Sequence, residues 1–341
     1  ERFWFWATSW QTFCMHLQIQ ELNKEWVKHM EDKAIKINTS NVLPDDAFED
    51  VVKEKQPAGT SYDRGLWYDI CRSFKENKVA LVCLIILIII AIASLLAPLS
   101  PYDPDAIDAT QKLLPPSKEH WFGTDDFGRD YFTRALYGGR VSLTVGLASM
   151  ICTTIIGTLI GTFSGYKGGK LDMVLMRFTD IFLALPSFLL MVVLNTLFSP
   201  GMVTLIAVLS LFSWASVARI TRAETMSLKQ KDFVLAAKSM GASHTEIIFK
   251  HIIPNMSASI IVAGSLGVAG AILTESSLSF LGLGVQLPQS SWGSMLQLAQ
   301  KYILDRPSMA VFPGLLILFT VLSFNIIGDV LRNALEPKMI K

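Results

Sequence analysis

The chain has 341 residues, of which 51% are hydrophobic and 17% are charged, and its formal net charge is +1. Soluble domains carry about 25% charged residues. The deficit here lies in long uncharged windows, which excludes an ordinary soluble fold and indicates a membrane protein. The small net charge gives no indication of nucleic-acid binding.

Residues 1–78 precede the first apolar window and are predicted to form a cytoplasmic N-terminal arm. The stretch Glu31–Lys55 is polar and mixed in charge, as in a flexible arm or short surface helices. Residues 1–29 are rich in Trp and Phe and lack the ordered regions of a signal peptide. They are either an interfacial helix or an extension upstream of a natural start at Met30, and they are assigned no function.

Six apolar windows are long enough to cross about 30 Å of hydrocarbon as helices. They lack the alternation of barrel strands, so the predicted fold is an all-α integral membrane protein with six transmembrane helices. The predicted spans lie near residues 79–99, 141–163, 178–198, 202–218, 255–274 and 307–328.

The Lys and Arg residues outside these windows predict an orientation. They are most frequent before the first window, between the second and third, between the fourth and fifth, and after the sixth. This bias places both termini in the cytoplasm. It also places the polar segment 229–254, between the fourth and fifth spans, in the cytoplasm.

Charged residues lie only near the ends of the windows. Arg177 and Asp180 are expected to pair on one helix face. Glu275 ends the fifth window, where its side chain is expected to reach the membrane interface. With no charge in the middle of a window, the pattern disfavours an ion-coupled carrier.

The sequence contains no motif for ATP hydrolysis or metal binding. The segment "GYKGGKLD" has Leu171 where a phosphate loop needs Ser or Thr. The four cysteines and five histidines form no metal-ligand spacing. We therefore expect no catalytic residue, cofactor or metal in this chain, so energy for uphill transport would come from a partner.

The segment "FVLAAKSMGASHTEIIFKHIIPN" is predicted to form a helical hairpin within residues 229–254. A first helix, Lys231–Met240, would end at Gly241 in the left-handed conformation. Ser243 and Glu246 would form a capping box that starts a second helix, and Pro254 would close it. The second helix is expected to expose a large apolar surface made of Ile247, Ile248, Phe249, Ile252 and Ile253. The first helix offers small or flexible side chains that suit docking into the groove of a partner, namely Ala236, Ala237 and Met240.

The hairpin resembles the EAA loop of ATP-binding-cassette importer permeases. Ala236, Ala237, Gly241, Ile253 and Pro254 match that motif, whereas Leu235 and His251 depart from it. Three further segments resemble the C-type permease of the oligopeptide and dipeptide branch: "HWFGTDDFGRDYFTRALYGGRVSL", "ESSLSFLGLGVQLPQSSWGSML" and "FNIIGDVLRNALEPK".

This resemblance implies a type I importer permease of a bacterial plasma membrane that forms half of a peptide pathway. Its implied partners are a second homologous permease, two cytoplasmic ATPases that bind ATP and Mg, an extracellular or periplasmic peptide-binding protein, and membrane lipid. The residues expected to couple it to the ATPases are Ala236, Ala237, Gly241, Ala242, Ser243, His244, Glu246 and Pro254. Substrate-binding residues are not assigned. The alternatives are a permease of the same family for nickel or another small solute, and a stand-alone carrier, channel or scaffold.

Overall fold

A computed structural model of the chain describes residues 66–198 and 201–335. These residues form helices joined by loops, with one isolated β-bridge between Thr124 and Asp130. The predictions for residues 1–65, which include most of the N-terminal arm, lie outside the described residues.

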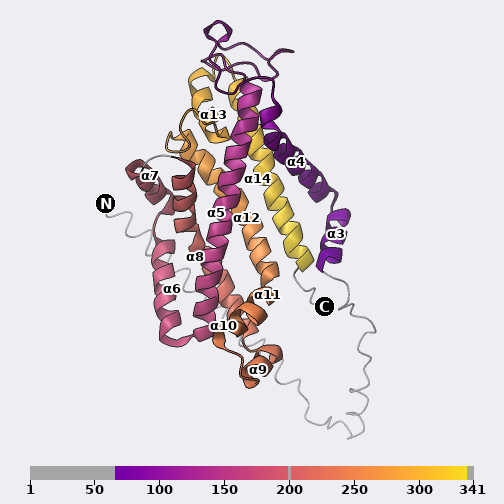
Figure 1. Ribbon diagram of the computed structural model, residues 1–341, viewed down its shortest axis with the longest axis vertical. Helices are drawn as coiled ribbons and strands as arrows, with labels where there is room; N and C mark the ends of the chain where they lie inside the picture. Colours follow the sequence, from indigo (N-terminus) through magenta and orange to yellow (C-terminus); the bar gives the residue numbers. More distant parts are fainter. Residues whose placement is uncertain (1–65, 199–200, 336–341) are drawn as a thin grey trace, which may run out of the picture. The chain divides into compact units, whose positions relative to one another are not determined.

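The helices run in alternating directions between two ends of a bundle (Figure 1). In chain order they are α3 (Leu66–Glu76), α4 (Lys78–Leu95), α5 (Tyr131–Lys167), α6 (Gly169–Ala184), α7 (Ser187–Leu197), α8 (Met202–Leu228), α9 (Asp232–Ser239), α10 (His244–Glu246), a π-helix (Ile247–Ile252), α11 (Ile253–Asn255), α12 (Ser257–Phe280), α13 (Trp292–Ala299) and α14 (Ser308–Leu335). Three short 3₁₀ turns lie at Ala97–Leu99, Ala109–Gln111 and Gln300–Tyr302.

The predicted all-α membrane architecture is confirmed for the described residues. Five helices, α4, α5, α8, α12 and α14, are long and apolar enough to cross a membrane. The pair α6 and α7 passes the same test together, which gives up to six spans.

The third predicted span differs from the structure. Instead of one straight helix near 178–198, α6 and α7 meet at a bend of 83°. Pro186 stands at the break and Leu185 before it is extended, with φ −78° and ψ 142°. A proline has no amide hydrogen and disfavours helical geometry in the preceding residue, so it separates the two helices.

Glycines on α5 allow it to pack closely against α8. A Cβ added to Gly157 would lie 2.8 Å from the carbonyl oxygen of Trp214, and one on Gly165 would lie 2.7 Å from that of Arg222. Gly161, one turn from each, faces Ala218 and Thr221. Because small residues let helix backbones approach in lipid, these positions fix the α5–α8 contact.

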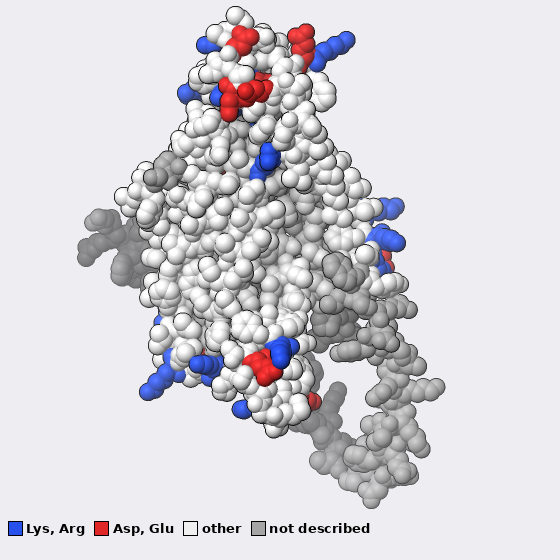
Figure 2. Space-filling model, in the orientation of Figure 1, with Lys and Arg blue, Asp and Glu red and all other residues white. Residues whose placement is uncertain are grey.

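Charged residues gather at the two ends of the face shown in Figure 2, and the zone between is largely uncharged. We call residues 97–130 the cap segment, and the end of the bundle where it lies the cap end. We call residues 229–255 the hairpin, and the opposite end the hairpin end. Large apolar side chains are exposed between these ends, including Ile89, Ile155 and Leu318, as expected of a surface that faces lipid.

Candidate functional site

The turn of the hairpin depends on one backbone conformation. Gly241 has φ +85°, and a Cβ built there meets no atom within 4 Å. Glycine is therefore favoured by the left-handed backbone and not by lack of space. Met240 beside it is 82% exposed, so the turn stands clear of the described chain.

The start of the second arm forms half of the predicted capping box. The Ser243 hydroxyl accepts a hydrogen bond from the Glu246 amide at 3.2 Å. The Glu246 carboxylate instead accepts from Lys250 Nζ at 2.7 Å. This hydrogen bond, and the charge of Lys250, lower the pKa of Glu246. The Lys250 bond takes the place of the reciprocal bond because Lys250 lies four residues further along the second arm.

The apolar residues of the hairpin mostly pack inside it. Val234 and Ala237 of α9 contact Ile247, Ile248 and Ile252 of the second arm, all with side chains at most 2% exposed. The large apolar surface that was predicted to face a partner is therefore largely internal. Phe249 lies between the buried isoleucines in the sequence, but its side chain is 50% exposed.

The same cluster joins the hairpin to three spans. Partly buried side chains from α5, α8 and α12 pack against it: Phe163, Tyr166, Leu228 and Ile260. The His244 ring also stacks edge-on with Tyr166 at 5.6 Å between centroids. Since one apolar core holds both arms and three span ends, the hairpin and those ends are expected to move as a unit.

The predicted coupling residues are not equally accessible. Ala236, Gly241, Ser243, His244 and Pro254 are exposed. Ala242 and Glu246 are half-buried, whereas Ala237 is 2% exposed within the hairpin core. Ala237 therefore supports the shape of the hairpin and does not itself offer a contact surface.

Two ion pairs connect α6 to α8 near the hairpin end. Arg222 binds Asp172 through two hydrogen bonds, of 2.6 and 2.7 Å, and Ser164 of α5 donates to the same carboxylate at 2.5 Å. Asp180 accepts from Arg219 at 2.6 Å, whereas the predicted Arg177 partner lies at 3.9 Å. The sequence prediction found the helix-local pair and missed the shorter pairs between helices.

The expected exposure of Glu275 at the membrane interface is wrong. Its side chain is 0% exposed, and its carboxylate accepts hydrogen bonds from Ser279 at 2.7 Å and from Ser142 of α5 at 3.0 Å. The Ser142 hydroxyl in turn accepts from the Trp292 amide of α13 at 3.3 Å. Helix α12 continues to Phe280 and packs on α5 and α13, so the carboxylate is enclosed before it can reach an interface.

The cap segment contains a second buried polar network. The Asp125 side chain is 0% exposed and accepts from Arg129 Nε at 2.7 Å, with Arg134 Nε at 3.7 Å. His120 lies between Asp130 and Gln111, at 2.8 Å from each. The sequence pattern predicted no role for the charges of this segment. The pairing of Asp125 with Arg129, four residues later, was the available signal.

No group of three or more His, Cys, Asp or Glu residues suited to a metal ion occurs in residues 66–198 and 201–335. The charged clusters described above are ion pairs and hydrogen-bonded carboxylates.

Comparison with known proteins agrees with this architecture. Residues 157–341 match the family described as "Binding-protein-dependent transport system inner membrane component". Residues 65–116 match "N-terminal TM domain of oligopeptide transport permease C". An inward-facing structure of the MetNI methionine ABC transporter shares the fold, with a TM-score of 0.50 and 17% identity over 60% of this chain and 97% of that one.

Curated relatives cover most of the chain. "Oligopeptide transport system permease protein OppC" of Bacillus subtilis is 41% identical over 280 residues, which are 81% of this chain and 91% of the relative. "Dipeptide transport system permease protein DppC" of Alkalihalophilus pseudofirmus is 42% identical over 274 residues, 80% and 90% of the two chains. "Oligopeptide transport system permease protein OppC" of Haemophilus influenzae is 42% identical over 305 residues, 89% and 97% of the two chains.

The fold and these matches define a multi-pass permease of a bacterial inner membrane. The chain belongs to the oligopeptide and dipeptide permease family of binding-protein-dependent ABC importers, as its sequence predicted.

Proposed function

We infer that this chain forms half of the translocation pathway of an ATP-driven importer for oligopeptides or dipeptides. The main support is the sequence similarity to a permease named for oligopeptide transport, with 41% identity over 81% of this chain. The sequence of the chain contains no phosphate loop. The energy for import therefore comes from ATP hydrolysis in partner subunits, which bind ATP and Mg.

Four partners complete this assembly. A second homologous permease forms the other half of the pathway, and two ABC ATPases dock on the hairpins, one per permease. A peptide-binding protein delivers cargo at the cap end. The family description, an inner membrane component of a binding-protein-dependent system, supports an assembly of this kind.

The hairpin is the coupling element in this account. Its exposed residues Ala236, Gly241, Ser243, His244 and Pro254 contact the ATPase, while Ala242, Glu246 and the buried Ala237 hold its shape. Closure of the ATPases moves the hairpin, and the shared core with α5, α8 and α12 transmits that movement to the spans. ATP thus changes the relative stability of outward-open and inward-open states.

The hairpin end lies in the cytoplasm and the cap end outside, according to the distribution of Lys and Arg. The test uses a chain whose 4 cysteines are replaced by serine. A new cysteine at Met240, which is 82% exposed, is labelled by an impermeant maleimide in inside-out vesicles only. The matched control at Trp121 in the cap, 64% exposed, is labelled in right-side-out vesicles only. The reverse pattern contradicts the orientation.

Cargo is tested by uptake into proteoliposomes that contain the complete assembly, with ATP enclosed and binding protein outside. We expect accumulation of radiolabelled tripeptide and none of nickel. Uptake of nickel without peptide would reassign the cargo within the family. Uptake by this chain alone would contradict the importer model.

A further inference from the structure

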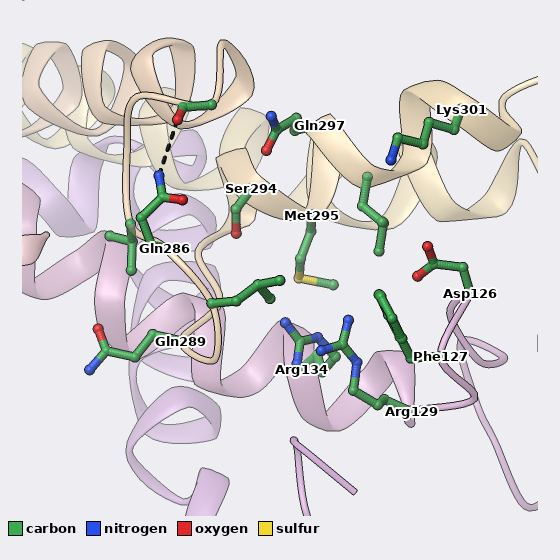
Figure 3. A pocket seen from close by; sticks show the side chains of 14 residues that line it. Asp126, Phe127, Arg129, Arg134, Gln286, Gln289, Ser294, Met295, Gln297 and Lys301 are labelled. Atoms are coloured by element: carbon green, nitrogen blue, oxygen red, sulfur yellow. Dashed lines mark hydrogen bonds between the residues drawn. The ribbon is translucent and has the colours of Figure 1, made fainter. Parts of the chain in front are cut away.

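A cavity of about 280 Å³ opens between the cap segment and α13. One wall is formed by Asp126, Phe127 and Arg129 of the cap, and the opposite wall by Gln297 and Lys301 from α13 and the turn after it (Figure 3). The loop 282–290 adds Gln286 and Gln289 on a third side. Small-molecule sites in proteins have volumes of about 300–1,000 Å³. The cavity lies just below this range, so it suits a very small ligand or only the end of a chain.

The charges of the lining favour an anion. The lining contains three cations, Arg129, Arg134 and Lys301, and one acid, Asp126. Outside the lining, Asp125 pairs with both arginines and Asp105 pairs with Arg134. Lys301 makes no ion pair with a carboxylate in the described part of the chain. The ammonium group of Lys301, which has no carboxylate partner among the described residues, favours a carboxylate over a second ammonium group at this position.

Arg129 is held ready to bind such a carboxylate. Its Nε donates to Asp125 at 2.7 Å, and its guanidinium lies over the Phe127 ring at 4.6 Å from the centroid. A guanidinium carries five N–H donors, and among the described residues the side-chain hydrogen bond recorded for Arg129 uses one of them. The terminal nitrogens therefore remain available for a planar carboxylate.

The cavity also contains groups that suit a peptide bond. Oδ1 of Asp126 is buried and has no hydrogen-bond partner among the described residues, so a ligand N–H would satisfy it. The carboxamides of Gln297 and Gln289 make no hydrogen bond within residues 66–198 and 201–335, and both residues line the cavity. Carboxamides both donate and accept, as the main chain of a peptide requires.

We propose that this cavity receives the C-terminal end of a peptide, with its carboxylate on Lys301 and Arg129, its last N–H on Asp126 and a main-chain amide on Gln297. The proposal rests on the proposed peptide cargo. An acidic side chain of a docked protein is the competing source of the carboxylate. The concave shape favours a peptide end, because a protein–protein contact usually needs about 800 Å² of surface per partner.

The test measures binding of radiolabelled trialanine to the full chain in lipid nanodiscs without any other protein. We expect trialanine and N-acetyl-trialanine to bind equally, and trialaninamide to bind at least about tenfold more weakly because it lacks the carboxylate. Acetate alone should compete only at much higher concentration, because it makes no amide contact. Equal binding of trialanine and trialaninamide, or no binding of either, overturns the proposal.

One variant and a matched control locate the site. Lys301→Gln should weaken trialanine binding by about tenfold. Lys118→Gln, an exposed cap residue outside this cavity, is the control and should bind like the parent. Thermal unfolding of each variant verifies folding. If Lys301→Gln binds trialanine normally and weakens only association with the binding protein, the cavity is a protein-docking site and the proposal is wrong.

Uptake by the complete parent assembly is measured in parallel. Peptide uptake with no peptide binding at this cavity rejects the further inference and leaves the proposed function intact. Absence of peptide uptake, with transport of another solute, rejects the proposed function itself.

Discussion

Arg222 of α8 binds Asp172 of α6 through two parallel hydrogen bonds, Nε to Oδ1 at 2.6 Å and a terminal nitrogen to Oδ2 at 2.7 Å. Lys229, two turns further along the chain at the end of α8, donates to the Gly165 carbonyl of α5 at 2.8 Å. The last turns of α8 and the first residue of the hairpin are thus tied to α6 and α5. These hydrogen bonds fix the position of α6 relative to the hairpin, even though α6 and α7 meet at a bend.

Asp172→Asn should destabilise the chain by about 1–3 kcal/mol, because Arg222 keeps its charge while its partner loses the negative charge and one of the two acceptor oxygens. The measurement is thermal unfolding in detergent. Arg177→Gln, on the same helix, is the control: its side chain is 81% exposed and its partner lies at 3.9 Å, so its loss should change stability by less than about 0.5 kcal/mol. Equal effects of the two changes would contradict the role of the Asp172–Arg222 pair.

Ala237 and Ala236 are neighbours with opposite predicted behaviour. Ala237→Phe adds a ring to the packed hairpin core and should destabilise it by about 1–3 kcal/mol. Ala236→Phe projects from the exposed face, so it should leave unfolding unchanged and weaken association with the ATPases. Thermal unfolding measures the loss of stability, and co-purification with the ATPases measures the loss of association. A destabilised Ala236→Phe and a stable Ala237→Phe would reverse the assignment.

Glu275→Ala should destabilise the cap end of the bundle. The change leaves the hydroxyls of Ser279 and Ser142 without their acceptor and opens a cavity, for a loss of about 2–4 kcal/mol. The exposed Glu119 in the cap is the control, and its replacement by alanine should be neutral. Thermal unfolding of both variants decides the matter, and a neutral Glu275→Ala would show that the buried carboxylate does not hold α12 to α5.

Asp126 gives the cap a specific dependence on pH. Burial and the neighbouring Asp125 raise the pKa of Asp126 above its ordinary 3.8, despite the opposing charges of Arg129 and Lys301. The folded protein therefore holds this proton more tightly than the unfolded chain. Its contribution to stability is largest below pH 3.8 and is lost as pH rises through the raised folded pKa.

Asp126→Asn removes this titration. The variant should gain stability relative to the parent as pH rises above 3.8, and the difference should level off once the carboxyl of the parent is ionised. The measurement is urea unfolding of the full chain from pH 4 to pH 8, with Asp103→Asn, another aspartate of the cap, as the control. A difference that grows toward low pH would contradict the assigned direction.

The spans and the hairpin turn could be predicted from the sequence because both depend on local properties. Apolar length identifies a span, and Gly241 identifies a left-handed turn without any knowledge of its surroundings. Pro186 carried a local signal as well, but an apolar window treats proline as a neutral residue and so hid the bend.

The buried charges could not be predicted in the same way. Glu275 and Ser142 are 133 positions apart, and Asp172 and Arg222 are 50 apart, so their pairing depends on helix packing. Likewise, the isoleucines of the hairpin were expected on its surface because nothing local indicates that Val234 and Ala237 cover them. Apolar side chains are equally suited to contact a partner and to form a small internal core, so the sequence does not distinguish the two arrangements.

Peptide uptake by an assembly that contains the Gly241→Val chain tests whether the hairpin couples the ATPases to the spans. The left-handed conformation at φ +85° disfavours a β-branched residue by about 1–2 kcal/mol, whereas Gly241→Asn tolerates it and serves as the control. We expect Gly241→Val to assemble and hydrolyse ATP in proteoliposomes but to lose most ATP-driven tripeptide uptake, while Gly241→Asn retains it. Uptake at the parent rate by Gly241→Val, with normal ATP use per peptide, would contradict the role of the hairpin as the coupling element.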